Sequence, residues 1–204
     1  QQGKGVCVGY PVDGLDVKII AISDAVIDDW QQATILAVNE IGEICVKGPQ
    51  VTRSYYNREQ QTALAKIATE GGFYHRMGDT GYFDEQGRLW FCGRKSQRVV
   101  TEQETLHSMC CEGIFNAHPK VFRSALVGVK RDNTVLPIIC IELEREHRNA
   151  DKSQLIEELK MRAAEHDITR NINTFLFHPA FPVDVRHNAK NGREKLARWA
   201  ETKR

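Results

Sequence analysis

Short apolar runs bounded by turn-forming residues fill the first half of the chain. Three of them are rich in β-branched or aromatic residues and are flanked by Gly, Asp or Pro, as strands are: 17-VKII-20, 42-GEICVKGP-49 and 88-RLWFCG-93. Between them, 59-EQQTALAKIA-68 follows the helix-capping residue type Asn57 and ends before a Gly-Gly pair, which predicts a helix. The first half is therefore expected to be β-rich with a single helix.

The pattern changes from Glu112 onward. A short helix is expected over 112–117, and two apolar runs joined by the polar turn 131-RDN-133 predict a hairpin. These runs are 121-VFRSALVGVK-130 and 135-VLPIICIELE-144. A third short strand is expected at 175-FLF-177, ahead of a basic tail.

A longer helix is expected in the same half. Ser153 is the predicted cap of a helix over 154–166, in which Leu155, Leu159 and Ala163 recur every four residues and so share one face. A helix that covers a small sheet is the expected arrangement. The change in character near Ser96 indicates two units.

Composition narrows the class of protein. The 204 residues are 41% hydrophobic and 27% charged, which suits an ordinary globular protein with one good core or two modest ones. The net charge of +1 gives no large field to attract nucleic acid or an anionic membrane. No apolar run approaches the length needed to span a bilayer, so no transmembrane segment is expected.

Six cysteines lie scattered without a CxxC pair. This pattern is typical of reduced, buried thiols, and it predicts a cytoplasmic location. The pair Cys110 and Cys111, with His107 and Glu112 close by, could form a metal site. A second ligand pair is missing, which favours a structural role, so no metal site is predicted among these residues.

Asp79 and Arg94 stand at the ends of two runs that the turn-like 84-DEQG-87 would join as a hairpin. Two interpretations are open from the residues alone. The pair could be a cross-strand ion pair, which contributes little at a surface. Alternatively, a carboxylate and a guanidinium could together bind a vicinal diol such as a ribose, because one accepts and the other donates hydrogen bonds.

Four segments, in order, resemble the adenylate-forming superfamily of acyl-CoA synthetases, peptide-synthetase adenylation domains and luciferases. They are 42-GEICVKGPQVTRSYYN-57, 61-QTALAKI-67, 72-GFYHRMGDTGYFDEQGRLWFCGR-94 and 118-HPKVFRSALVGV-129. Two residues depart from the family's pattern: Ser54 stands where glycine is usual, and Met77 where threonine is usual.

The resemblance implies an α+β fold and two domains with different roles. Residues 1–95 would be the C-terminal, β-rich part of the large AMP-binding domain, and residues 96–204 would be a small mobile C-terminal domain. Asp79 and Arg94 would hydrogen-bond the ribose hydroxyls of ATP and of the acyl-adenylate. Ser96 would be the hinge about which the small domain swings between two orientations.

The tail segment 188-NAKNGR-193 resembles the family's loop that carries a catalytic lysine. The resemblance implies that Lys190 reaches the acyl carboxylate and the α-phosphate during adenylation, where an ammonium stabilises the developing charge. A solvated cation in a basic tail is the alternative interpretation. A second register, on 192-GREK-195, would make Lys195 the catalytic lysine.

The acceptor of the acyl group is the remaining question. Acyl-CoA ligases have a glycine nine residues beyond the ribose arginine, where pantetheine passes close to the backbone. Here that position is Gln103, no glycine occurs in 97–112, and Val100 stands where luciferases have a second lysine. A CoA tunnel is therefore not expected.

Within the superfamily, 186-RHNAK-190 and 77-MGDTGYFDEQGRLWFCGR-94 resemble the bacterial β-lactone synthetases of olefin biosynthesis. The resemblance implies that ATP and Mg²⁺ activate a 2-alkyl-3-hydroxy fatty acid, whose own hydroxyl then displaces AMP, with enzymes of the same pathway as partners. A medium- or long-chain acyl-CoA ligase and an inactive AMP-binding fragment are the alternatives. No Gly-rich phosphate loop occurs, so this fragment alone is not expected to turn over.

Overall fold

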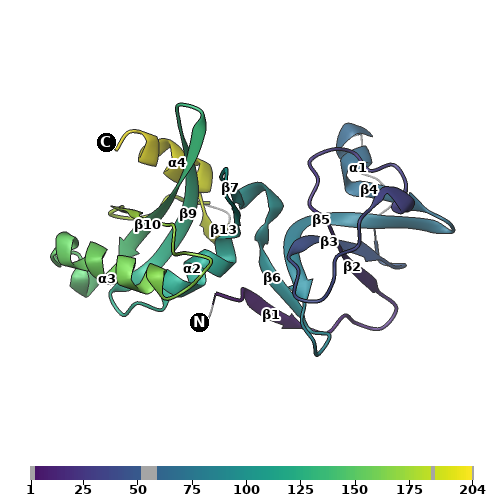
Figure 1. The fold of residues 1–204 in the computed structure, drawn as a ribbon, viewed down its shortest axis with the longest axis horizontal. Coiled ribbons are helices and arrows are strands. Elements are labelled where there is room, and N and C mark those ends of the chain that lie inside the picture. The colour runs from purple at the N-terminus through teal and green to yellow at the C-terminus, as the bar shows by residue number, and fades with distance from the viewer. Residues whose placement is uncertain (1–2, 52–58, 185–186, 204) are drawn as a thin grey trace. The chain divides into compact units, whose positions relative to one another are not determined.

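The computed structural model describes residues 3–51, 59–184 and 187–203, with only the backbone described for 183, 184 and 187–191. The chain divides into two compact units, Gly5–Ser96 and Gln97–Arg204, and Gly3 and Lys4 group with the second (Figure 1). Each unit has its own sheet and its own core. The expected cap Asn57 and the position Ser54 lie outside the described residues.

The first unit is built on one six-stranded antiparallel sheet. Its strands lie in the order β1-β6-β5-β3-β2, and β4 pairs with β5. The strands are β1 (Val6–Gly9), β2 (Asp16–Ile20), β3 (Gly42–Lys47), β4 (Lys66–Thr69), β5 (Gly72–Phe83) and β6 (Leu89–Arg94). A 3-10 turn, Trp30–Gln32, and helix α1 (Glu59–Ala65) complete the unit. The strands predicted at 17–20, 42–49 and 88–93 are confirmed.

The helix predicted over 59–68 is shorter than expected. Helix α1 ends at Ala65, and the next four residues form β4. Ile67 is fully buried in a small core and lies opposite Tyr74 on β5, whose ring stacks on Trp30 at a centroid distance of 3.8 Å. Burial of Ile67 in the sheet therefore outweighs the helix propensity of the sequence.

The turn between β5 and β6 is organised by Asp84. Its Oδ1 accepts from the backbone N–H groups of Gln86 and Arg88, and its Oδ2 accepts from Arg88 Nε and Trp90 Nε1 at 2.7 and 2.8 Å. Gly87 takes a φ of 75°, which suits glycine in such a turn. This turn fixes the register between β5, which leads into it, and β6, which follows it.

The second unit has a three-stranded sheet in the order β11-β10-β9, with β9 and β10 antiparallel and β10 and β11 parallel. The strands are β9 (Val121–Arg131), β10 (Thr134–Leu143) and β11 (Thr174–Phe177). The helices are α2 (Ser108–Asn116), α3 (Lys152–Ala164) and α4 (Arg193–Glu201). Two small ribbons, β7 (Val99–Val100) with β8 (Thr105–Leu106) and β12 (Val183–Asp184) with β13 (His187–Asn191), and 3-10 turns at Lys95–Gln97 and Arg145–His147 complete the chain.

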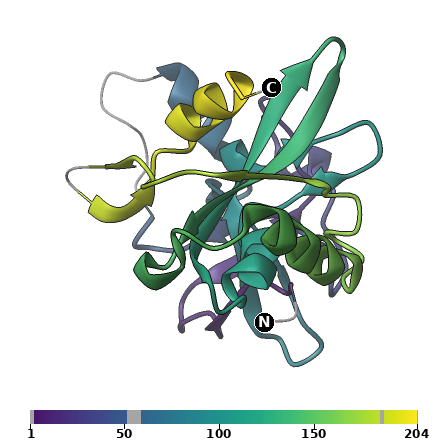
Figure 2. The same cartoon turned by 90° about the vertical axis from the view of Figure 1, so that its left-hand side faces the viewer.

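Helices cover both faces of this small sheet. Leu126 and Ile139 pack with α2 and α3, whereas their strand neighbours Val127 and Cys140 pack with α4. Successive strand side chains point to opposite faces, so the two cores alternate along β9 and β10. Figures 1 and 2 show α3 (green) and α4 (yellow) on opposite sides of the β9–β10 hairpin. The α+β architecture and the hairpin are confirmed.

Helix α3 buries the predicted face. Leu155, Leu159 and Ala163 are all buried, but the helix begins earlier than expected. Its cap is Asp151, whose carboxylate accepts from the N–H groups of Ser153 and Gln154, so the prediction of Ser153 as the cap was wrong. Both residue types suit a cap, and only the backbone geometry decides between them.

Side chains of α2 occupy the outer edge of β9. Asn116 Oδ1 accepts from Ser124 N at 2.7 Å, and Glu112 Oε1 accepts from Leu126 N at 2.8 Å. Four residues along a helix span about 6 Å and two along a strand about 6.7 Å, so the two spacings nearly match. The helix thereby satisfies N–H groups that β10 does not reach.

The cysteines are free, and all but the exposed Cys7 are buried: Cys45, Cys92, Cys110, Cys111 and Cys140. Burial raises the pKa of the Cys45 and Cys140 thiols to about 12, which disfavours the thiolate. None of the helices in the described ranges is both long enough and apolar enough to cross a membrane.

Candidate functional site

Asp79 and Arg94 lie directly opposite each other on β5 and β6. Arg94 Nη1 is 3.0 Å from Asp79 Oδ1, with about half of the arginine side chain exposed and a fifth of the aspartate side chain. Gly78, with a φ of 66°, turns the backbone immediately before the aspartate. The hairpin predicted from 84-DEQG-87 thus brings the two side chains together, with the carboxylate recessed and the guanidinium reaching out.

The carboxylate of Asp79 is partly buried against Arg94. Its Oδ1 is covered by the protein and lies 3.0 Å from Arg94 Nη1, while a fifth of the side chain remains exposed. Burial raises the pKa of Asp79, and the Arg94 charge only partly opposes this. The exposed part of the carboxylate keeps acceptor capacity that a ligand hydroxyl could use.

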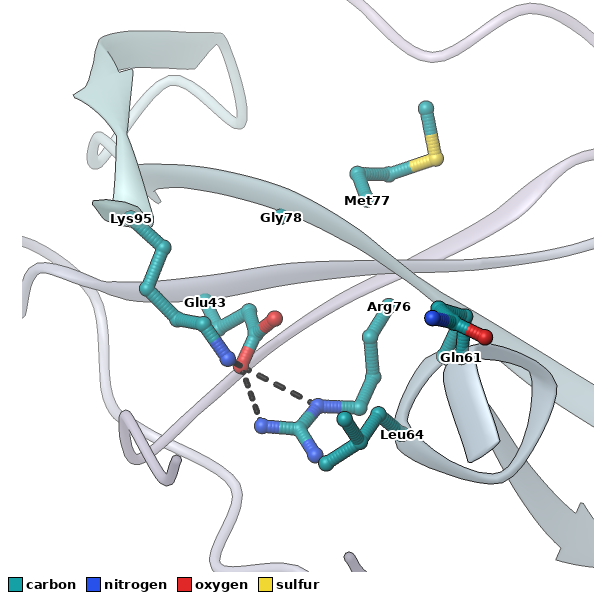
Figure 3. Close-up of a pocket in the computed structure, with 8 residues that line it drawn as sticks. Glu43, Gln61, Leu64, Arg76, Met77, Gly78 and Lys95 are labelled. Atoms are coloured by element: carbon teal, nitrogen blue, oxygen red, sulfur yellow. Dashed lines mark hydrogen bonds and ion pairs between the residues drawn. The ribbon is translucent and has the colours of Figure 1, made fainter. Parts of the chain in front are cut away.

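A buried charge network holds the two strands beside this pair. Glu43 Oε2, on β3, accepts from Arg76 Nη2 at 2.7 Å and from Lys95 Nζ at 3.2 Å (Figure 3). Only 1% of the side chain of Glu43 or of Arg76 is exposed. Because Arg76 precedes Asp79 by three residues and Lys95 follows Arg94 directly, the network fixes the backbone on both sides of the pair.

A pocket of about 390 Å³ opens beside this network, within the first unit. Glu43, Arg76, Lys95 and Gln61 are its polar lining residues, and Leu64, which lies beside Arg76 in Figure 3, and Met77 are apolar ones. Arg76 also donates to backbone: Nη1 donates to Ala25 O at 2.8 Å, and Nη2 donates to Ser23 O. The lining of the pocket holds one carboxylate, Glu43, and two cations, Arg76 and Lys95, so it carries a net positive charge.

Ser96, the predicted hinge, is exposed and lies in the short 3-10 turn Lys95–Gln97. The boundary between the two compact units falls directly after it. Lys95 is fastened to Ser23 O at 2.9 Å as well as to Glu43, so the first unit remains fixed up to the residue before Ser96. Movement about Ser96 stays a prediction.

Lys190 lies in the second unit, on the backbone of β13. Its side chain lies outside what the structure describes. Lys195, the other candidate, is exposed on the first turn of α4. Gln103 is exposed in a tight turn that Thr101 closes by accepting from the N–H of Glu104, and Val100 is 49% exposed.

The cysteines and the histidine around the start of α2 are buried within the fold. Cys110 and Cys111 are buried, and Glu112 is bound to Leu126 and Arg193. Burial and the nearby Arg98 charge lower the pKa of His107 to about 4. No group of three or more His, Cys, Asp and Glu suited to a metal ion occurs in the described ranges.

Two buried ion networks escaped the sequence analysis: Glu43 with Arg76 and Lys95, and Glu112 with Arg193. The partners are 33 and 81 residues apart, so no local spacing links them. The available signal was indirect, since Glu43 and Arg76 each stand inside an apolar strand pattern at a buried position. A charge at such a position calls for a buried partner.

Comparison with known proteins shows which proteins the chain resembles. No protein-family model matches it. It is 52% identical over 205 residues to an olefin beta-lactone synthetase of Stenotrophomonas maltophilia, and 47% identical over 209 residues to one of Xanthomonas campestris. The matches cover 98% and 100% of this chain, but the chain spans only 37% and 38% of those two proteins.

Solved structures share the fold. An ATP-bound RpMatB-BxBclM chimera superposes with a TM-score of 0.76 at 24% identity, over 96% of this chain and 36% of that one. The o-succinylbenzoate CoA synthetase of Bacillus subtilis, in complex with its acyl-adenylate intermediate, gives a TM-score of 0.71 at 24% identity, over 93% and 35%. The chain therefore has the fold of the C-terminal part of these adenylate-binding enzymes, and over its length it is similar to part of the olefin beta-lactone synthetases.

Proposed function

We propose that the chain forms the ribose clamp and the lysine-bearing small domain of a ligase that activates a fatty acid carboxylate as acyl-AMP. The observation that carries this proposal is the partly exposed carboxylate of Asp79 directly opposite Arg94. One ribose hydroxyl donates to this carboxylate, and the exposed guanidinium donates to the hydroxyl oxygens. Two adjacent hydroxyls match one acceptor and one fork of donors.

Adenylation needs positive charge at the reacting phosphate. The carboxylate oxygen of the acid attacks the α-phosphorus of ATP, and pyrophosphate leaves. Lys190 lies in the segment that resembles the family's lysine loop, and its ammonium would stabilise the negative charge that builds up on the phosphate oxygens. Residues 96–204 bring this lysine to the site by rotating about Ser96.

Magnesium is the metal ion expected with ATP. Mg²⁺ is usually held by one or two carboxylates together with substrate phosphates. We assign no residue of the described ranges to the ion and derive no step through it.

We propose a β-lactone as the product. The relatives that match the full length of the chain are named olefin beta-lactone synthetases, which supports this product. The 3-hydroxyl oxygen of the bound acyl-AMP attacks the acyl carbon, loses its proton, and releases AMP as the four-membered ring closes. Attack within one molecule needs no second substrate, in keeping with the glycine-free segment 97–112.

The clamp is tested by pyrophosphate exchange in the full-length protein, with ATP compared to 2′-deoxy- and 3′-deoxy-ATP. Asp79→Ala should lower kcat/KM for ATP by about 10- to 150-fold, the effect of losing one hydrogen bond to a charged group. The variant should also show a smaller preference for ATP over the deoxynucleotides, because only Arg94 then binds the hydroxyls. Glu85→Gln removes an exposed carboxylate from the same hairpin and should change neither value. A variant that keeps the full wild-type preference for ATP over both deoxynucleotides would refute the role of Asp79 in the clamp.

The lysine and the product are tested separately. Lys190→Ala should abolish acid-dependent exchange while Lys195→Ala retains it, and the reverse result would move the role to Lys195. For the product, the full-length protein receives ATP, Mg²⁺ and a 2-alkyl-3-hydroxy acid without CoA. A lactone carbonyl band in the infrared is expected. Strict dependence on CoA would exclude the lactone and favour an acyl-CoA ligase.

A further inference from the structure

Glu112 and Arg193 form a buried, two-pronged ion pair in the second unit. Arg193 Nη2 donates to Glu112 Oε2 at 2.8 Å, and Nη1 makes a second, close contact to Oε1. The side chains are 6% and 15% exposed, and the residues lie 81 positions apart. The pair therefore joins α2 to the first residue of α4.

The pair also engages the edge of the sheet. Leu126 N donates to Glu112 Oε1 at 2.8 Å, and Leu126 O accepts from Arg193 Nη1 at 3.3 Å. Both backbone polar groups of this β9 residue are thus held by the same two side chains. The start of α4 is fixed against the sheet in both position and direction.

The fixed point lies close to the predicted catalytic lysine. Gly192 donates its N–H to Pro182 O at 2.6 Å, and β13 ends at Asn191. Lys190 precedes Arg193 by three residues, which can span at most about 10 Å of chain. The ribbon that carries the lysine therefore leaves directly from the anchored residue.

A gain in folding stability does not by itself explain why this buried ion pair is present. A buried ion pair often contributes little net stability compared with apolar residues of similar size, because both charges lose their water. Helix α4 is already held to the sheet by Leu196 and Ala200, both buried. What the pair adds is orientation, since a planar guanidinium and a carboxylate fit in one arrangement only.

We infer that Glu112 and Arg193 are positioning residues that set where Lys190 stands during adenylation. This inference rests on the proposed function, in which Lys190 acts on the phosphate. It assigns Arg193 no contact with the substrate. Its effect passes through the ribbon, because loosening the anchor lets the lysine occupy positions away from the reacting oxygen.

The test compares three variants of the full-length protein: Arg193→Gln, Arg193→Lys and Arg198→Gln. Two readouts are followed, pyrophosphate exchange and amide hydrogen exchange by mass spectrometry. Arg193→Gln should lower kcat of exchange about 10- to 100-fold, as displacement of a reacting group by about 1 Å does, with KM for ATP within about twofold of wild type. Amide exchange should rise in β12 and β13 and stay unchanged in β9 and β10.

Arg193→Lys keeps the charge that compensates Glu112 but loses the fork, so it should fall between wild type and Arg193→Gln. It also supplies the measurement if Arg193→Gln unfolds the second unit, which would appear as loss of protection in β9 and β10. Arg198 lies on the same helix in an exposed pair 3.9 Å long, so Arg198→Gln should match wild type.

Two results overturn the inference: wild-type kcat with a loosened ribbon, or reduced kcat with an unchanged ribbon. Failure of the proposed function gives a distinct result: Lys190→Ala would then leave pyrophosphate exchange unchanged. If Lys190→Ala abolishes exchange and Arg193→Gln does not lower it, only the positioning role is lost.

Discussion

Protonation of His107 should destabilise the second unit as the pH falls below about 6.5. The residue stands directly before α2, is 9% exposed, and has a pKa lowered to about 4 by burial and by Arg98. The positive end of a helix also disfavours an added positive charge. In the unfolded chain the imidazole has an ordinary pKa of about 6.5, so between the two values the unfolded state binds more protons.

The magnitude follows from the two pKa values. Stability from this group is fully present above about pH 6.5 and is lost as the pH falls toward 4. The loss amounts to about 2 kcal/mol at pH 5 and approaches about 3 kcal/mol at pH 4. In His107→Gln the side chain does not titrate in this pH range, so the variant should lack this part of the pH dependence of stability.

The assay is urea unfolding of the 204-residue chain at pH 7 and pH 5, with hydrogen exchange in α2 to assign the unit that unfolds. Carboxylates also titrate in this range, so the quantity of interest is the difference between wild type and His107→Gln. His166→Gln, in the same unit, controls for loss of an imidazole elsewhere. If wild type and His107→Gln lose the same stability within about 0.5 kcal/mol, the buried, neutral imidazole is refuted.

Two further changes should separate buried from exposed positions by urea unfolding. Glu43→Gln leaves Arg76 charged and buried, so it should cost about 3 to 5 kcal/mol, whereas Glu59→Gln at the exposed start of α1 should cost under about 0.5 kcal/mol. Phe115→Ala empties a fully buried site and should cost about 3 to 5 kcal/mol, and Phe122→Ala, at a residue 54% exposed, should cost much less. Equal costs within either pair would contradict the packing described.

The sequence predicted what is local. The Asp79–Arg94 opposition follows from strand periodicity and one turn, and the structure pairs these residues in register. The β9–β10 hairpin was predictable for the same reason, with Asp132 at a φ of 51° in its turn. In each case residues within about ten positions of the turn determine the outcome.

Features that depend on distant partners were missed. Residues 66–69 form a strand because Ile67 packs into a core with Ile20, Cys45 and Trp30, which come from distant parts of the sequence. The Glu112–Arg193 pair joins a residue that precedes all three strands of the small sheet in the sequence to a residue that follows them. Such contacts are chosen by the tertiary fold, and the sequence shows only that a charge stands among apolar residues.

The way α2 lies along β9 limits what can join this sheet. Strand edges with free N–H and C=O groups are templates on which another chain can add a strand, which leads to aggregation or domain swapping. Here the N–H groups of Ser124 and Leu126 are bound by Asn116 and Glu112, and the C=O group of Leu126 is bound by Arg193. Removing the Arg193 fork would free the Leu126 carbonyl, one acceptor that a strand from another molecule could use, while the N–H groups of β9 stay bound by α2.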